Sequence, residues 1–358
     1  MGLDAVEASY FKRSSLWKFT VVLLAVILFV VIIVSLNVGY AQIPFEHILL
    51  ILGKRVPGIS SVIDSSVVPS VEEMIIMQIR LPRIFAGALV GAALAAAGVM
   101  YQGIFKNPMA DSYVLGVSAG ASVGASFAIV FGAGLTLVGM GAVQVAAFTG
   151  AILTVFLVYS ISRVGPKVPV TTLLLSGIAV SIFLSAIVTI LTVISGNKLH
   201  GIVFWLAGGF FNVEWVDVWA VVPFILLGIL ASYFFARDLN LLALGEETAQ
   251  HLGVNTERVK QVLLVLGSLV TAAAVSISGL IGFVGLMIPH ITRLLIGPDH
   301  RVLLPASTII GAIFLVICDA VARVLTGAME LPVGVITALA GGPFFVYLLR
   351  KKKASYGM

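Results

Sequence analysis

The sequence predicts an all-α, polytopic membrane protein with about ten transmembrane helices in a single domain, residues 1–358. First, 60% of the residues are hydrophobic and only 10% are charged, whereas soluble proteins carry about 25% charged residues. Second, the chain divides into apolar segments of about 20 residues, the length that crosses a bilayer as a helix. Third, the basic residues gather in alternate connecting segments, as the positive-inside rule requires.

The first apolar segment, 17–39, follows Lys12 and Arg13 and has Lys18 at its start. It is longer than the apolar core of a signal peptide, which runs to about 7–15 residues, so we expect an uncleaved first transmembrane helix. The other predicted spans are 81–104, 113–132, 136–162, 169–194, 215–235, 260–278, 280–295, 303–322 and 333–349. An eleventh, short apolar helix, re-entrant or interfacial, could form around Gly201–Phe211.

The basic residues predict the orientation of these spans. Ten spans place both termini on one side, and a cytoplasmic side would hold all but six of the 21 basic residues. Those six are Lys54, Arg55, Arg80, Arg83, Lys198 and Arg323. We therefore expect a cytoplasmic N-terminus (1–16), a basic cytoplasmic tail (350–358), a cytoplasmic segment at 236–259 and an outer segment at 40–79. Two apolar stretches of the outer segment, 43–53 and 69–78, are too short to span, and we expect them to lie along the outer membrane face.

Glycines recur four residues apart in Gly87–Gly91 and in Gly116–Gly124. On a helix this spacing clears a groove for a neighbouring helix. Tight packing inside one subunit is the first interpretation, and helices that slide past one another are the second.

Several kinds of site are missing from the sequence. It has no phosphate-binding loop, no His/Cys cluster with metal-ligand spacing and no Ser–His–Asp arrangement. The single cysteine, Cys318, has no partner for an internal disulfide, and the net charge of +5 is better explained by topology than by nucleic acid. We expect no catalytic residue, no metal site and no cofactor.

Energy for uphill transport would come from another protein. The alternative is a self-sufficient secondary transporter or channel, with Asp319 as its candidate coupling residue.

Long motifs carry a resemblance to a known family. The stretch QIRLPRIFAGALVGAALAAAGVMYQGIFKNPMADSYVLGVSAGASVG (Gln78 to Gly124) resembles the signature of permease subunits of type II, FecCD-type ABC importers for iron-siderophores, haem and cobalamin. Gly279 to Pro305 and Glu330 to Lys351 are similar to C-terminal motifs of that family, and LNLLALGEETAQHLGV is similar to its cytoplasmic coupling segment. The resemblance runs from about Trp17 to Lys351.

The resemblance implies a homodimer of ten-helix permeases in the plasma (inner) membrane of a prokaryote. Two cytoplasmic ATPase subunits would bind ATP and magnesium, and a soluble substrate-binding protein would dock outside. The chain itself would be no enzyme. It would translocate a bulky metal chelate, whether a ferric siderophore, haem or cobalamin.

Within 236–259, the spacing predicts two short helices joined by a glycine. Asn240 is expected to cap a helix at Leu241–Leu244, which Gly245 breaks, and Gly253 to end the second helix. The resemblance implies that this segment contacts the ATPase; packing on the helix ends of its own subunit is the alternative. The candidate coupling residues are Leu242, Leu244, Gly245, Glu246, Glu247, Ala249, Leu252 and Gly253.

Three arginines and two gate residues complete the candidate sites. Arg80 and Arg83 lie at the predicted start of a span, where cations oppose the helix dipole. The resemblance implies that they and Arg323 receive acidic residues of the binding protein. The alternatives are lipid headgroups, pairing of the first two with Glu72 and Glu73, and a salt bridge from Asp319 to Arg323. The resemblance also places a gate near Val170 and Thr171, where packing of a helix start is an equal alternative.

Overall fold

The computed structural model describes residues 3–55, 68–111, 113–132, 141–165, 167–326 and 330–356. In these ranges the chain is helical apart from turns and one isolated β-bridge between Val164 and Lys167. The α-helices are α1 Leu3–Asn37, α2 Phe45–Gly53, α3 Ser70–Met74, α4 Leu81–Ile104, α5 Val117–Phe131, α6 Ala142–Ser162, α7 Val170–Ile194, α8 Leu199–Ala207, α9 Trp215–Phe234, α10 Ala236–Ala243, α11 Glu246–His251, α12 Thr256–Ser278, α13 Val284–Ile296, α14 His300–Val324 and α15 Val333–Tyr356.

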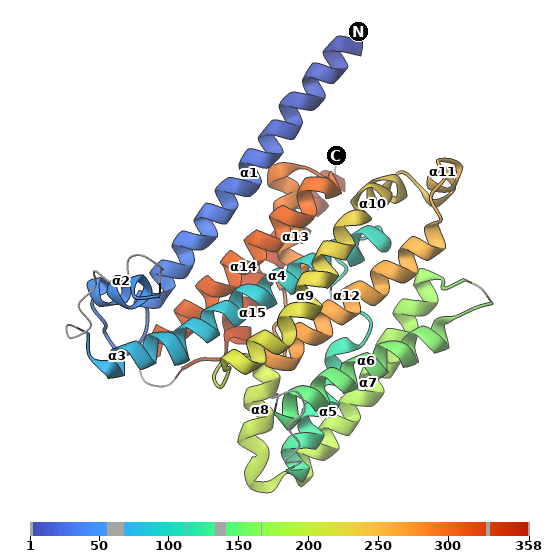
Figure 1. The fold of residues 1–358 in the computed structure, drawn as a ribbon. Coiled ribbons are helices and arrows are strands. Elements are labelled where there is room, and N and C mark those ends of the chain that lie inside the picture. The colour runs from blue at the N-terminus through green and yellow to red at the C-terminus, as the bar shows by residue number, and fades with distance from the viewer. Residues whose placement is uncertain are drawn as a thin grey trace.

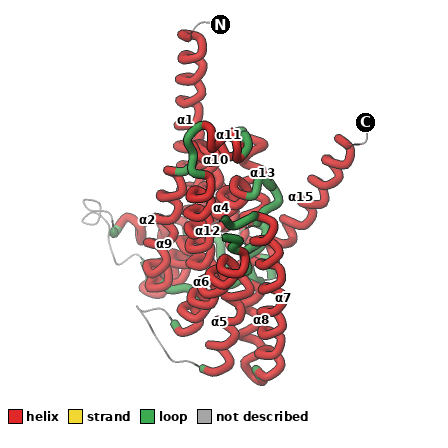
Figure 2. The backbone as a smooth tube through the Cα atoms, turned by 90° about the vertical axis from the view of Figure 1, so that its right-hand side faces the viewer, coloured by secondary structure: helices red, strands yellow, loops and turns green. Residues whose placement is uncertain are grey.

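The long helices run side by side as one tilted bundle (Figure 1). Helices α10 and α11 lie at one end together with both chain termini, whereas α2, α3 and α8 lie toward the other. Figure 2 shows the same separation from the side, with the N-terminal part of α1 and the end of α15 projecting from the bundle. We call these the α10 end and the α8 end. Which end faces the cytoplasm stays a prediction, because helix packing alone sets no direction across a membrane.

The ten predicted spans are confirmed as ten apolar helices. Seven helices in the described ranges are long and apolar enough to cross a membrane, and α5, α13 and the apolar part of α15 are shorter. The eleventh short helix is also present, as α8. Residues 56–67 of the outer segment, 136–140 of one predicted span and the last two residues of the tail lie outside the described ranges.

The structure corrects the outer segment at its second apolar stretch. Helix α3 continues through a π-helical turn, Ile75–Arg80, directly into α4. Ser70–Ile104 is therefore one continuous apolar helix of 35 residues rather than a surface stretch followed by a span. As a consequence, Arg80 and Arg83 do not lie in a first helical turn, and the dipole argument made for them is wrong.

Helix α4 is the centre of the bundle, because 78% of its most apolar stretch is buried, against 17% for α7. Two of its glycines, Gly91 and Gly98, face glycines of other helices. A Cβ atom at Gly91 would lie 2.2 Å from the carbonyl oxygen of Gly311 in α14, and one at Gly98 would lie 1.9 Å from that of Gly285 in α13. The interpretation of tight packing inside one subunit is confirmed at Gly91 and, in the second stretch, at Gly124, where a Cβ atom would lie 2.0 Å from the carbonyl oxygen of Ala146.

Candidate functional site

Helices α10 and α11 form a compact unit at the α10 end, which we call the coupling knob (residues 236–253). Gly245 separates them with a φ of 126°, and Gly253 follows α11 with a φ of 89°. Both backbone conformations favour glycine over residues with a Cβ atom. The two-helix prediction is confirmed, and Gly253 ends the second helix as expected.

The predicted cap at Asn240 is wrong. Helix α10 begins at Ala236, almost continuous with α9, so Asn240 lies inside it. Its side-chain amide instead donates to Asp299 Oδ1 at 2.8 Å, and its oxygen accepts from the backbone N–H of His300 at 2.9 Å. Asn240 therefore joins the coupling knob to the start of α14.

Asp299 is the N-cap of α14, and its side chain accepts from the backbone N–H of Arg301. Burial by itself would raise its pKa, but hydrogen bonds from Arg301 and Asn240, and the charge of Arg301, lower the pKa of Asp299 to about 2. The carboxylate is ionised at neutral pH, so this connection between α10 and α14 is charge-assisted.

A second connection joins the coupling knob to α12. The Lys260 ammonium is buried in the fold and lies 2.7 Å from Glu246 at the start of α11 and 3.0 Å from Glu257 of its own helix. Moving Glu246 away from Lys260 would weaken the pairing of a buried cation, and an unpaired buried charge is costly. The coupling knob is thus tied to two helices that cross the bundle.

The apolar residues of the coupling knob divide into two groups. Leu242 and Ala249 are at most 2% exposed and belong to the main core, whereas Leu244 is 66% and Leu252 is 59% exposed. Glu247 is also exposed. Packing on the subunit itself therefore accounts for the first group, and the exposed pair remains available to a partner. The contact with an ATPase stays a prediction.

The three candidate docking arginines form a buried cluster near the α8 end. Arg83 Nε donates to Asp319 Oδ1 at 2.8 Å and Arg83 Nη1 to Glu330 at 2.5 Å. Arg323 Nε lies 3.1 Å from Asp319 Oδ2 as an ion pair whose angles fall outside hydrogen-bond geometry. Arg80 donates to backbone carbonyls, including that of Leu36.

The salt bridge predicted between Asp319 and Arg323 is confirmed, but the pairing predicted with Glu72 and Glu73 is not. Glu72 contacts His47, and Glu73 contacts Lys54 and Arg55. The three arginines of the cluster are at most 5% exposed. Their docking role stays a prediction, and in this structure it would require them to leave their internal partners.

The two gate residues lie at the start of α7. Val170 is its first residue and is half-buried, and Thr171 is exposed. Both predicted interpretations, a gate and a helix start, are compatible with this position, so the gate also stays a prediction.

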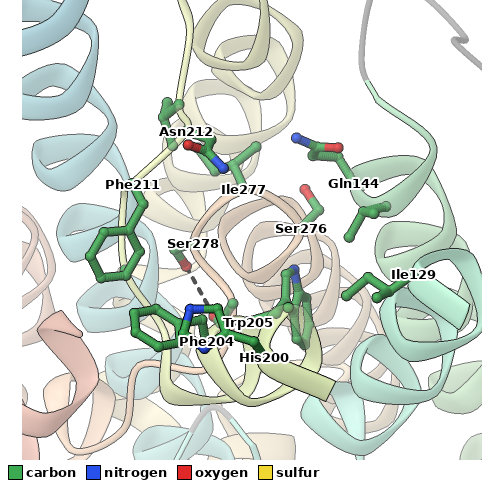
Figure 3. A pocket seen from close by; sticks show the side chains of 15 residues that line it. Ile129, Gln144, His200, Phe204, Trp205, Phe211, Asn212, Ser276, Ile277 and Ser278 are labelled. Atoms are coloured by element: carbon green, nitrogen blue, oxygen red, sulfur yellow. Dashed lines mark hydrogen bonds between the residues drawn. The ribbon is translucent and has the colours of Figure 1, made fainter. Parts of the chain in front are cut away.

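A cavity of about 430 Å³ beside α8 was not foreseen from the sequence. It lies where α8 and the chain after it meet the ends of α5 and α12 and the start of α6, and Figure 3 shows its polar and aromatic side chains. Its lining includes the side chains of Gln144, His200, Phe204, Trp205, Phe211 and Asn212. They come from three separate elements, and no local motif marks them. Among the described residues, no group of three or more His, Cys, Asp or Glu side chains could hold a metal ion.

Comparisons with known proteins agree with this architecture. Residues 27–351 match the FecCD transport family. The cobalamin import system permease protein BtuC of Halobacterium salinarum is 49% identical over 80% of this chain and 76% of its own length. The vitamin B12 import system permease protein BtuC of Klebsiella pneumoniae is 38% identical over 96% of both chains. Further relatives, 39–41% identical, are named as hemin, iron(3+)-hydroxamate and Fe(3+)-citrate permeases.

A solved structure, described as a metal-chelate type ABC transporter in an inward-facing conformation, superposes with a TM-score of 0.77. It is 34% identical and covers 92% of this chain and 98% of its own. The ten apolar helices, the glycine-packed centre and these matches over most of the sequence lead to one conclusion: the chain is a multi-pass protein of the inner membrane and belongs to the FecCD transport family.

Proposed function

We propose that the chain is the membrane-spanning subunit of an ATP-driven importer that translocates a metal chelate. The observation that carries this proposal is the coupling knob. It presents exposed apolar side chains at one end of a permease fold and is bonded to two helices that cross the bundle, α12 and α14. The relatives named for cobalamin, hemin, iron-hydroxamate and iron-citrate transport support the cargo class.

Energy would enter through the coupling knob from a separate ATPase that binds ATP and magnesium. Leu244 and Leu252 would fill a groove of that partner, since exposed leucines on a compact polar unit gain from burial in an interface. A displacement of the coupling knob would then reach α14 through Asn240 and α12 through Lys260. Both connections are short and involve charged groups, so they would transmit a displacement of the coupling knob to the helices better than a flexible loop would.

A second copy of this chain would complete the pathway. Helix α7 is only 17% buried in its apolar stretch, and its outward side chains include Ile182 at 68% and Phe183 at 66% exposure. Such a face suits lipid or another subunit. We assign part of it to a homodimer contact, with the cargo passing between the two copies after delivery by an external binding protein at the α8 end.

The alternative of a self-sufficient secondary transporter or channel is less well supported. Asp319, its candidate coupling residue, is 0% exposed and held between Arg83 and Arg323. A carboxylate paired in this way is poorly placed to bind and release an ion in each cycle.

Reconstitution tests the proposal. The chain is placed in proteoliposomes alone, and then with its ATPase and binding protein, and uptake of a radiolabelled chelate is measured with and without ATP. Uptake that needs all components supports an importer, whereas uptake by the chain alone supports the alternative. Cysteines introduced at Leu244 and Leu252 should crosslink to the ATPase, and a cysteine at the buried Leu242 serves as the matched control.

A further inference from the structure

The cavity beside α8 has the size and composition of a small-molecule site. Its volume of about 430 Å³ falls within the range of about 300–1,000 Å³ that ligand pockets occupy. Phe204, Trp205 and Phe211 give it aromatic walls, and His200 stacks against Phe204 with ring centroids 4.2 Å apart. Mostly apolar walls with a few convergent polar groups are typical of ligand pockets.

Three polar side chains of the cavity have hydrogen-bonding groups without a partner among the residues that the structure describes. Within the described part of the chain, the amides of Gln144 and Asn212 make no side-chain hydrogen bond, and neither does the Trp205 indole N–H. The hydroxyls of Ser276 and Ser278, by contrast, are bonded to carbonyl oxygens of their own helix. Figure 3 shows Gln144 and Asn212 on opposite sides of the space, with Trp205, Phe204 and His200 below them.

Charge is the second property of this lining. None of the described residues that line the cavity is Asp, Glu, Lys or Arg. Arg83 lies 5.8 Å from the ring of Phe211, but Asp319 and Glu330 already neutralise it. A carboxylate that entered the cavity would lose its water and meet only neutral amide and indole donors and the imidazole of His200, with no lysine or arginine to balance its charge, which is unfavourable compared with an uncharged group. An amide would gain partners, because Gln144 and Asn212 both donate and accept.

We propose that this cavity binds an uncharged, amide-bearing face of the transported chelate, and so favours neutral chelates over carboxylate-bearing ones. The inference rests on the proposed function and narrows its substrate class. Among the cargoes named for the relatives, cobalamin carries amide side chains and a hydroxamate is an amide-type group, whereas hemin and citrate carry carboxylates.

Protection of an introduced cysteine tests the site. In a Cys318→Ser background, Ile129→Cys places a thiol on the wall of the cavity without touching its polar groups. The permease with its ATPase, in lipid nanodiscs without binding protein, is labelled with a thiol reagent at increasing concentrations of cobalamin, a ferric hydroxamate, hemin or ferric citrate. We expect the first two to slow labelling and the last two to have no effect. Tyr40→Cys, at a position 77% exposed and outside the cavity, should label at the same rate throughout.

Two variants test the amides themselves. Gln144→Leu and Asn212→Leu keep similar volumes but lose the amide, and each should raise the half-protecting concentration of cobalamin about three- to tenfold, the value of one neutral hydrogen bond. Thr149→Val, on the exposed side of the same helix as Gln144, should leave it unchanged. Both leucine variants should still label at Ile129→Cys without chelate, which shows that the cavity is intact.

The outcomes separate this inference from the proposed function. Equal protection by hemin or ferric citrate would overturn the proposed chelate class, and unchanged half-protection in both leucine variants would overturn the role of the amides. If no chelate protects Ile129→Cys while proteoliposomes of the full importer still take up a chelate, the cavity is not a site and the proposed function stands. If no chelate is taken up at all, the proposed function and the inference that rests on it both fall.

Discussion

Asp319 holds two arginines in the interior of the bundle, and replacing it with asparagine should destabilise the fold. The side chain is 0% exposed and lies 2.8 Å from Arg83 and 3.1 Å from Arg323. Asp319→Asn keeps the shape and leaves no cavity, so the variant isolates the loss of one buried negative charge.

The contacts around Asp319 determine how much stability the variant should lose. Removing one partner of a buried ion pair costs about 3–5 kcal/mol. Both arginines keep other partners, since Arg83 still contacts Glu330 and Arg323 donates to Ser35 and to the carbonyl of Val38. We therefore expect the lower end of the range, a loss of about 3 kcal/mol in the free energy of unfolding.

Thermal unfolding of the purified protein in detergent measures this loss. The Tm of Asp319→Asn should fall by several degrees, while that of Glu247→Gln, an exposed acid in the coupling knob, should stay at the wild-type value. The double variant Asp319→Leu with Arg323→Met should recover part of the loss, because it removes both charges of a buried pair. A Tm for Asp319→Asn equal to the wild type would refute the reasoning.

Three further predictions follow from other contacts. Asn240→Leu should raise the ATP hydrolysed per chelate imported in proteoliposomes, because the coupling knob loses its bonds to Asp299 and α14 while its exposed face is unchanged. Gly98→Val should abolish recovery of folded protein in size-exclusion chromatography, since even a Cβ atom would lie 1.9 Å from the carbonyl oxygen of Gly285. The carboxylate of Asp299, with its pKa lowered from 3.8 to about 2, should stabilise the protein fully above about pH 4, so the Tm difference between wild type and Asp299→Asn should shrink between about pH 4 and pH 2.

Each of these predictions has a matched control. Asp238→Asn changes an acid of the same helix α10 and should keep the wild-type ratio of hydrolysis to import; an equal ratio in Asn240→Leu would contradict its role. Gly342→Ala, at a helix position with open space around the added atom, should be recovered normally, and normal recovery of Gly98→Val would contradict the packing argument. A Tm difference for Asp299→Asn that persists unchanged at pH 2 would exclude ionised Asp299 as its source.

The coupling knob and the arginine cluster show which features of the candidate site could be predicted from the sequence and which could not. Gly245 and the acids after it marked two short helices, because a helix break and its flanking residues are local properties of the chain. The same local reasoning failed at Asn240 and Arg80. Whether α9 continues into α10, and α3 into α4, depends on neighbouring helices rather than on the residues at the junction.

The sequence by itself determined the class of the protein, its ten apolar helices and the position of the polar coupling knob, because apolar length, glycine spacing and charge are written along the chain. Only the tertiary structure decided which charges meet and where a cavity opens. Arg83 and Asp319 are 236 residues apart in sequence, and the cavity draws its polar groups from three elements that no single stretch contains. Such sites arise from helix packing, in which the partner of each side chain lies on a distant segment.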